Sequence, residues 1–297
     1  MSRESADPSD PLAAHVASEI ARLLQRPLGA GLHIVATPIG NLGDITLRAL
    51  AVLHRADVIY CEDTRHSRTL LSHYGIRRPL QPYHEHNAAE QRPRVLSALE
   101  RGRRVALISD AGTPLISDPG FKLTREAIAA GHHVEHCPGA SAALTALTVA
   151  GLPSDTFLFA GFLPAKPHAR QERLRELAPA PATLVVFEAP QRVAETLSDM
   201  ASVLGARHAA VARELTKLHE TVARGTLDEL AQSFASTDPK GEIVLVIGPP
   251  SAEAASDDVI RAKLSMALRD MTLRDAAKAV ADALRVPKAR VYDLGLQ

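Results

Sequence analysis

The chain has 297 residues, 46% of them hydrophobic, which is enough to bury a sizeable core and favours two domains. Only 3% of the residues are aromatic and Trp is absent, which argues against nucleic-acid binding driven by base stacking on aromatic platforms. Lys plus Arg and Asp plus Glu both number 34, so any contact with a nucleic acid must come from local basic clusters rather than from an overall positive charge.

The cysteine content and the hydropathy of the chain indicate its cellular compartment. Cys61 and Cys137 provide no disulfide framework, which is typical of a reducing cytoplasm. No apolar run approaches the length of a membrane span, and the first ten residues carry charges of both signs with no apolar segment after them. We therefore expect a cytoplasmic protein without a membrane helix or signal peptide, and residues 1–30 as an N-terminal extension with one short helix.

Apolar runs typical of strands alternate with helical stretches from residue 32 to residue 248, which predicts an α/β fold. The apolar residues of 103–109 run on without alternating, as in a strand buried on both faces. Small residues become frequent near residue 140, so we predict two lobes, residues 31–139 and 140–250. The predicted strands cover residues 32–37, 56–62, 103–109, 132–137, 183–188, 208–214 and 241–248, with a further apolar run at 157–164. The predicted helices cover residues 45–53, 67–75, 88–101, 121–131, 138–153, 168–177, 193–204 and 227–234.

The last part of the chain, residues 251–297, is predicted to be a linker and a helical tail. Residues 249–258 are rich in Pro, Ser and Ala, as in a linker. Thr272 with Asp275 resembles a capping box, and Pro287 suits the first turn of a helix. Two short helices joined at residues 285–287 indicate either a helix-turn-helix or, more ordinarily, a helical lid packed on the body.

Three loops rich in Gly, Pro and small residues follow predicted strands, at residues 36–44, 109–120 and 137–144. In open α/β sheets, ligands bind beyond the carboxyl ends of the strands. Gly lets main-chain groups approach a ligand closely, so these loops could bind an adenosine and an amino-acid head. Each loop alone is more often a tight connection, but three in one α/β unit favour a ligand site. The G-x-G-x-x-G and P-loop patterns are absent, which disfavours NAD-linked and P-loop chemistry.

Charged residues follow several predicted strands directly and are candidates for a general base and a phosphate clamp. Solvated loops, helix caps and surface ion pairs are the ordinary alternatives. The candidates are Glu62, Asp63, Arg65, Glu188, Arg213, Glu214 and Lys217.

Histidines gather in two short segments. Residues 82–87, with His84 and His86, could line the mouth of a site, and residues 132–136 hold three more histidines. Neither group offers a clean third and fourth ligand, so we expect no catalytic metal.

The segments LHIVATPIGNLGDITLRAL, CEDTRHSRTLL, LISDAGTPLISDPG, PGASAALTAL, FAGFLP and VFEAPQRV together resemble those of the tetrapyrrole methylase superfamily over residues 31–297. Within it, the chain resembles the branch that 2′-O-methylates a cytidine ribose in 16S ribosomal RNA. Precorrin-type relatives carry G-x-G-P-G where this chain has residues 36–40, and they have no block like Glu62–Arg65. Both differences favour the RNA branch.

The resemblance implies a two-lobed α/β fold, a homodimer, and S-adenosylmethionine bound as methyl donor in the cleft between the lobes. It also implies small-subunit ribosomal RNA, bare or in the assembled subunit, as the partner. The donor contacts that it implies are Thr37, Pro38, Ile39, Gly40, Asp110, Ala111, Gly112, Thr113, Pro138, Gly139, Ala140 and Ser141. It does not identify the catalytic base.

The expected reaction is in-line attack of a ribose 2′-oxygen on the donor methyl, which needs a base because a hydroxyl is a poor nucleophile. Glu62, Asp63, Glu188 and Glu214 are the candidate bases, while Arg65, Arg213 and Lys217 could hold a phosphate or stabilise the alkoxide. Arg outnumbers Lys 27 to 7, and its planar fork suits phosphate. The clusters expected to contact RNA are Arg65/Arg68, Arg77/Arg78, Arg101/Arg103/Arg104 and Arg170/Arg173/Arg175.

Two other functions fit the same sequence. A small-molecule methylase would act on a tetrapyrrole or similar macrocycle. A non-catalytic RNA-binding assembly factor would use the C-terminal helices and transfer no methyl group.

Overall fold

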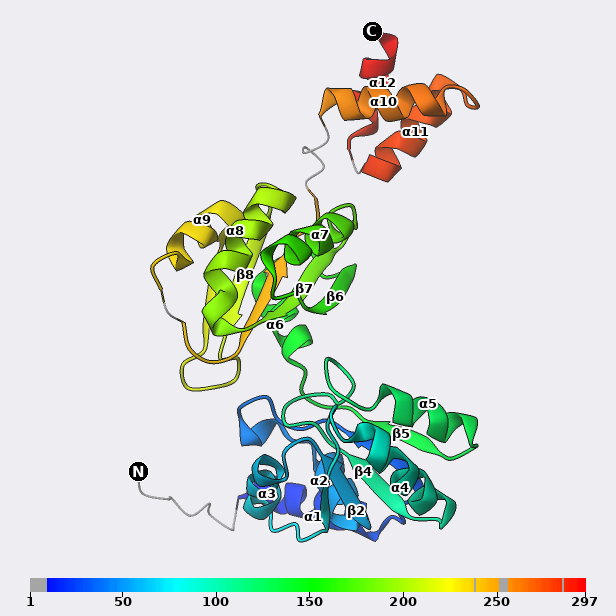
Figure 1. Ribbon diagram of the computed structural model, residues 1–297, viewed down its shortest axis with the longest axis vertical. Helices are drawn as coiled ribbons and strands as arrows, with labels where there is room; N and C mark the ends of the chain where they lie inside the picture. Colours follow the sequence, from blue (N-terminus) through cyan, green and yellow to red (C-terminus); the bar gives the residue numbers. More distant parts are fainter. Residues whose placement is uncertain (1–9, 238, 251–255, 285) are drawn as a thin grey trace. The chain divides into compact units, whose positions relative to one another are not determined.

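The computed structural model describes residues 10–237, 239–250, 256–284 and 286–297. The chain divides into two compact units (Figure 1). The first comprises Met1–Ala146 and Arg213–Thr221, and the second comprises Leu147–Ala212 and Val222–Gln297. Residues 1–9 of the predicted extension, 251–255 of the predicted linker and Arg285 of the predicted turn lie outside the described residues.

The first unit contains a five-stranded sheet in the order β3-β2-β4-β1-β5, with every neighbouring pair parallel. From β1 the chain passes over β4 to reach β2, and from β4 it passes over β1 to reach β5. The order therefore reverses between β1 and β4, which is the topological switch point where α/β sheets bind ligands. The strands are β1 (Gly31–Val35), β2 (Val58–Cys61), β3 (Leu80–Pro82), β4 (Arg104–Leu107) and β5 (Val134–Cys137).

Helices cover both faces of this sheet, because successive strand residues point to opposite sides. Val35, Ile59 and Ala106 pack with α2 and α3 on one face, whereas Leu32 and Val105 pack with α4 and α5 on the other. Burial on both faces explains the unbroken apolar runs of the sequence. The helices are α2 (Leu47–Arg55), α3 (Thr64–His73), α4 (Ala88–Glu100) and α5 (Phe121–Ala129), with a 3-10 turn, η1 (Leu42–Asp44), before α2.

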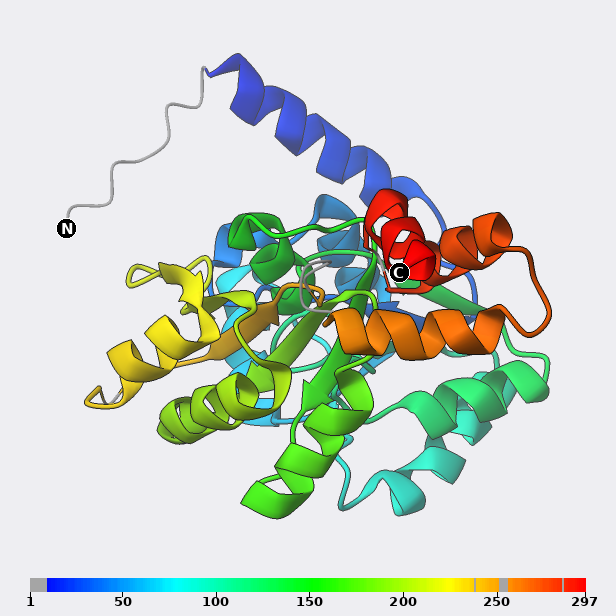
Figure 2. The same ribbon diagram turned by 90° about the horizontal axis from the view of Figure 1, so that it is seen from above.

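Two further helices belong wholly or partly to the first unit. The extension forms α1 (Pro11–Gln25), which has no buried residue and extends away from the sheet of its own unit (Figure 2). The boundary between the units falls inside α6 (Ala142–Ala150), six residues beyond the predicted junction near residue 140.

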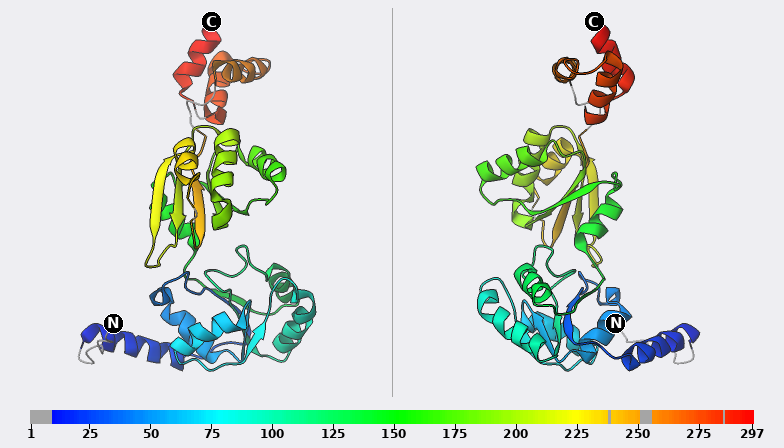
Figure 3. Two further views of the ribbon diagram at one scale, coloured as in Figure 1. Left: turned by 60° about the vertical axis from the view of Figure 1, so that its left-hand side comes forward. Right: turned by 90° about the vertical axis from the view of Figure 1, so that its right-hand side faces the viewer.

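The second unit has a mixed sheet in the order β6-β7-β10-β8-β9. β6 is parallel to β7, and β10 is antiparallel to it. Three helices pack on one face of this sheet (Figure 3) and contribute Leu174, Leu197 and Leu227 to the core between them and the strands. The strands are β6 (Phe157–Phe162), β7 (Thr183–Glu188), β8 (His208–Arg213), β9 (Thr221–Thr226) and β10 (Ile243–Ile247). The helices are α7 (Pro167–Leu177), α8 (Val193–Leu204) and α9 (Leu227–Phe234), with a 3-10 turn, η2 (Pro190–Arg192), before α8.

The prediction that Arg170 contacts RNA, as part of the cluster Arg170/Arg173/Arg175, is wrong. Its side chain is only 1% exposed, and its guanidinium lies between α7 and α8, where Nε donates to Asp199 Oδ2 at 2.6 Å. Glu195 accepts a second hydrogen bond from the same guanidinium. The buried charge ties two helices together and cannot reach a nucleic acid.

The C-terminal part forms three helices with a core of their own, α10 (Asp257–Ala267), α11 (Leu273–Leu284) and α12 (Lys288–Leu296). Ile260, Val280 and Val291, one from each helix, meet in that core. The sequence predicted only two helices here. The Thr272 hydroxyl oxygen accepts from the Asp275 backbone N–H at 3.3 Å, which caps α11, while Pro287 stands at the N-cap of α12 instead of in its first turn.

The α/β fold and the helical tail are confirmed, and the seven predicted strands all form with each end within two residues of the predicted one. β3 and β9 were missed because LQP is too short, and TVARGT too polar, to stand out by hydropathy. No helix in the described part of the chain is both long and apolar enough to cross a membrane.

Candidate functional site

Two of the small-residue loops are joined by main-chain hydrogen bonds at the switch point of the first sheet. The Thr37 N–H donates to the Gly112 carbonyl at 2.9 Å, and the Gly112 N–H donates back to the Thr37 carbonyl at 3.1 Å. The Thr37 hydroxyl also donates to the Ser109 carbonyl at 3.2 Å. The loops after β1 and β4 are therefore held in one fixed arrangement.

The third loop joins them through one side chain and one close contact. The Thr113 hydroxyl donates to the Ala140 carbonyl at 3.1 Å. A Cβ added to Gly139 would lie only 3.0 Å from the Cβ of Ala36, so the loop after β5 lies directly against the loop after β1. The structure thus brings the predicted donor-binding loops to the carboxyl edge of three neighbouring strands, with Gly40, Ala111, Pro138 and Gly139 exposed there.

A strained turn after β8 lies against the first loop, within the first unit. A Cβ on Gly40 would come within 2.7 Å of Lys217 Cε, so the lysine side chain crosses this glycine. Lys217 Nζ lies 2.8 Å from Glu214 Oε1. Glu214 and Thr216 have φ of 52° and 66°, a left-handed backbone that costs energy for residues other than Gly.

Arg213 occupies the base of the same turn. Its Nε donates to Thr221 Oγ1 at 3.2 Å, which ties the end of β8 to the start of β9. Three of the seven predicted catalytic candidates, Arg213, Glu214 and Lys217, therefore occupy one turn beside the first loop.

Asp63 and Arg65 cap the start of α3 and pair with each other. Asp63 Oδ1 accepts from the Arg65 backbone N–H at 2.7 Å at the start of α3, and Oδ2 accepts from the Arg65 guanidinium at 2.9 Å. These hydrogen bonds lower the pKa of Asp63 to about 2. Such a carboxylate is a weak base, and the arginine beside it is already paired.

Glu62 has the opposite electrostatic environment. Partial burial, followed by the negative charges of Asp110 and Glu85, raises the pKa of Glu62, while His84 acts against them. Asp110 itself accepts from the Asp63 backbone N–H at 3.0 Å, which connects the end of β2 to the loop after β4. Glu62 therefore lies beside the predicted donor-binding loops as a carboxylate that holds a proton more readily than usual.

Asp118 was overlooked, although it lies in the predicted loop 109–120. Burial, and then the charge of Glu62, raises its pKa to about 6, with Asp110 adding to the effect and a hydrogen bond from Ser109 opposing it. Only its place in the SDPG turn could have identified it, because the sequence does not show that two separate loops bring Glu62 and Asp118 together. A raised pKa at a sheet edge is typical of functional carboxyls.

Glu188 lies in the second unit, at the end of β7, and is 3% exposed. Oε1 accepts from the Ala189 N–H at 2.7 Å and from Arg192 Nε at 2.8 Å, and Oε2 accepts from the Thr196 hydroxyl at 2.6 Å. A buried carboxylate with this many donors holds the start of α8, and the geometry does not favour it as a base.

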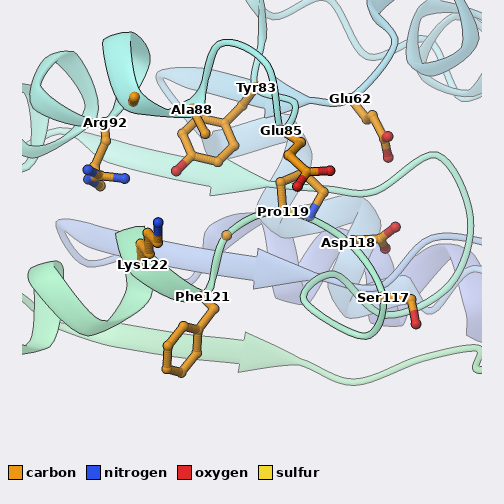
Figure 4. A pocket seen from close by; sticks show the side chains of 12 residues that line it. Glu62, Tyr83, Glu85, Ala88, Arg92, Ser117, Asp118, Pro119, Phe121 and Lys122 are labelled. Carbon is orange, nitrogen blue, oxygen red and sulfur yellow. The ribbon is translucent and has the colours of Figure 1, made fainter. Parts of the chain in front are cut away.

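A pocket of about 490 Å³ opens next to Glu62 and Asp118 (Figure 4). Tyr83 and Glu85, from the segment predicted to line a mouth, form part of its wall, together with Arg92 of α4 and Lys122 of α5. Among the described residues, no three His, Cys, Asp or Glu side chains are grouped so that they could hold a metal ion.

Two of the predicted basic clusters are partly used inside the fold. Arg104 pairs with Asp57 and lowers the pKa of that carboxyl to about 2. Arg78 Nε donates to the His54 carbonyl at 2.5 Å. These two guanidiniums stabilise the first unit, so they contribute less to a nucleic-acid surface than the sequence predicted.

The family model described as Tetrapyrrole (Corrin/Porphyrin) Methylases matches residues 31–231. With a match over more than half of its length, the chain belongs to this family. The predicted family is therefore confirmed.

Curated relatives match nearly the whole chain. It is 54% identical over 264 residues to ribosomal RNA small subunit methyltransferase I from Mesorhizobium japonicum, which covers 88% of this chain and 88% of the relative. It is 47% identical over 273 residues to the protein of the same name from Pseudomonas aeruginosa, with 90% of this chain and 96% of the relative covered.

Solved structures of lower identity show the same fold. A conserved hypothetical protein from Aeropyrum pernix aligns with a TM-score of 0.59 at 17% identity, over 90% of this chain and 96% of that one. Uroporphyrin-III C-methyltransferase from Thermus thermophilus, complexed with S-adenyl homocysteine, aligns with a TM-score of 0.52 at 19% identity, over 73% of this chain and 97% of that one.

Asp118→Asn should stabilise the protein at neutral pH. Between the ordinary pKa of 3.8 and the folded pKa of about 6, the folded state binds a proton that the unfolded state has released, so the free energy of unfolding falls as pH rises through this window. Removing the charge should raise Tm by about 2–4 °C at about pH 7.5, a gain of roughly 1 kcal/mol, and the gain should shrink toward about pH 4. Thermal unfolding of both proteins across the pH range measures this.

Asp57→Asn is the matched control of opposite sign. Its folded pKa is depressed to about 2, so its charge stabilises the protein above the ordinary pKa of 3.8, and removing it should lower Tm at neutral pH. A lower Tm for Asp118→Asn at neutral pH, or a gain that does not depend on pH, would contradict the prediction.

Proposed function

We propose that this protein transfers a methyl group from S-adenosylmethionine to the ribose 2′-oxygen of a cytidine in 16S ribosomal RNA. The observation that most supports this function is that three hydrogen-bonded small-residue loops meet at one switch point, with carboxyls of raised pKa beside them. The relatives named ribosomal RNA small subunit methyltransferase I support the choice of RNA. The proposal includes a homodimer, as the family resemblance implies.

The loops fit a donor that is bound largely through main-chain groups. Gly112 has φ of 77°, and a Cβ there would lie 3.2 Å from Ile39 Cγ2, so the close packing of the loops depends on the missing side chain. Ala111, Pro138 and Gly139 are exposed and remain for an adenosine and an amino-acid head. S-adenosylmethionine supplies an electrophilic methyl group and leaves as a neutral thioether.

Glu62 is the base that the geometry favours. A hydroxyl proton passes to its carboxylate as the new carbon–oxygen bond forms and the carbon–sulfur bond breaks. The products are the 2′-O-methyl ribose, S-adenosylhomocysteine and protonated Glu62, which then releases the proton to water. A raised pKa suits this role because a base works best when its pKa is close to the working pH. Lys217, held against Gly40 beside Glu214, places a positive charge by the first loop, where it would stabilise the oxygen as it becomes an alkoxide.

Incubation with methyl-labelled S-adenosylmethionine tests the function directly. Bare small-subunit RNA, assembled small subunits and a porphyrinoid extract are the three acceptors, and nuclease digestion followed by nucleoside analysis locates the label. We expect the label in the ribose of a cytidine. Label in a macrocycle would support the small-molecule methylase, and RNA binding without label would support the assembly factor.

Gly112→Ala should weaken donor binding about tenfold or more, because it combines a left-handed backbone with a contact against Ile39. Gly102→Ala is a matched control, since Gly102 has φ of 69° and nothing within 4 Å of its Cβ position. Both variants should lose the stability that a left-handed alanine costs, and Gly112→Ala somewhat more through its contact with Ile39, but only Gly112→Ala should lose affinity in calorimetry with S-adenosylmethionine. Equal donor affinity in the two variants would contradict the placement of the donor.

Glu62→Gln should lower kcat about 100-fold while the donor affinity stays within twofold, because the amide keeps the shape of the side chain and cannot accept the proton. Asp63→Asn should keep kcat within a few-fold and change stability little, because asparagine caps a helix about as well as aspartate does. Single-turnover methylation and donor calorimetry measure the two effects. If Asp63→Asn is the variant that loses turnover, the assignment of Glu62 is wrong.

A further inference from the structure

The pocket beside Glu62 is charged at both ends, with opposite signs. Glu62, Glu85 and Asp118 carry its carboxyls, and Arg92 and Lys122 carry its cations. Figure 4 shows the charged ends of Arg92 and Lys122 close together on one side, and Glu62 and Asp118 on the other. A ligand that fills it must therefore offer hydrogen-bond donors at one end and a negative charge at the other.

We infer that this pocket binds a ribose–phosphate unit of the RNA strand, with ribose hydroxyls at Glu62 and Asp118 and a phosphate at Arg92 and Lys122. The inference rests on the proposed function and adds the subsite that receives the acceptor. A carboxylate accepts hydrogen bonds from hydroxyl groups, and guanidinium and ammonium groups donate to phosphate oxygens. The neighbouring hydroxyl and phosphate of one nucleotide meet both requirements.

The residues at the acidic end of the pocket are close in sequence to the predicted donor loops. Asp118 lies six residues after Gly112 in the same loop, and Glu62 immediately precedes Asp63, whose N–H is bound by Asp110. A ribose at this end would therefore lie near the base proposed above. The charge of Glu62 also raises the cost of ionising Asp118, which a hydroxyl donor would reduce.

The cationic end of the pocket is held in place by contacts within the protein. Arg92 Nε lies 2.9 Å from Glu126 Oε2, and the Arg92 side chain is only 22% exposed. The Arg92 guanidinium also lies near the hydroxyl of Tyr83, whose side chain is 1% exposed. A guanidinium held by Glu126 in this largely buried position loses little freedom on binding phosphate, whereas Lys122 is exposed and can move to a second oxygen.

The loop that forms the floor of the pocket is strained. Leu115 and Ser117 have φ of 73° and 66°, and neither is a glycine. Gly120 has φ of 137°, and a Cβ there would lie 3.0 Å from side chains of Leu107 and Leu115. Left-handed residues of this kind cost conformational energy and cluster at ligand sites. The strain shapes the turn that presents Asp118.

Other ligands fit the charges less well. Three carboxyls would repel a polycarboxylate macrocycle, and they also disfavour a lone anion. Phe121, next to Lys122, is 65% exposed, in a chain where aromatic residues are rare. An exposed ring at the edge of the pocket offers a surface for the base of the bound nucleotide.

Cytidine 3′-monophosphate and its 2′-deoxy counterpart probe the pocket without any methyl transfer. We expect saturable binding of the ribonucleotide with a Kd on the order of millimolar, and at least threefold weaker binding of the deoxynucleotide. Lys122→Gln and Asp118→Asn should each weaken the ribonucleotide at least threefold. Lys166→Gln, at an exposed lysine just before α7, should leave the Kd unchanged. Ligand titrations followed by NMR or calorimetry measure these values.

Methylation of small-subunit RNA provides the second readout. Lys122→Gln should raise KM for RNA about fivefold, leave the donor Kd unchanged, and reduce the slope of log K against log salt by about one, since one phosphate contact is lost. Nucleotide binding without methylation of any RNA would overturn the proposed function and keep the pocket. Methylation with normal KM in Lys122→Gln, or no saturable nucleotide binding, would overturn the pocket and keep the function.

Discussion

The pair of main-chain hydrogen bonds between Thr37 and Gly112 is the interaction on which the candidate site depends. It forms because β1 and β4 are parallel neighbours whose connections leave in opposite directions. At such a point the two following loops have no helix between them and can bond to each other. The loop after β5 joins through the Thr113 hydroxyl and the Ala140 carbonyl, so the geometry of all three loops depends on two main-chain hydrogen bonds and one side chain.

The carboxyls of the chain divide into two groups by how well their charge is compensated. Asp57, Asp63 and Glu188 each bond to a guanidinium, and the first two have depressed pKa values as a result. Burial raises the pKa values of both Glu62 and Asp118, and nearby carboxylates add to it: Asp110 and Glu85 for Glu62, and Glu62 for Asp118. The first group stabilises the fold, whereas the second destabilises it at neutral pH. A destabilising pair of carboxyls next to a strained loop is typical of a functional site.

The sequence was sufficient for the fold because the three central strands of the first sheet are largely apolar on both faces and each of the three small-residue loops carries its own Gly and Pro signals. It was also sufficient to select the three loops. It could not separate Glu62 from Asp63, which are adjacent in sequence but differ in whether Arg65 can reach them. Nor could it show that Arg170 is buried, because the partners Glu195 and Asp199 come from the next helix along the chain. Pairing across elements is decided by packing, which local patterns do not contain.

The zero net charge of the chain is consistent with an RNA substrate once the internal use of arginine is taken into account. Arg170, Arg104 and Arg192 neutralise carboxylates within the units, so they leave no excess charge to attract RNA nonspecifically. Recognition would then depend on a few cations in fixed positions and on acceptors for hydroxyl groups. A pocket that combines Arg92 with Glu62 meets this condition: a surface cluster of arginines would bind any phosphate chain, but a cation and a carboxyl at opposite ends of one pocket select a strand that carries a hydroxyl beside its phosphate.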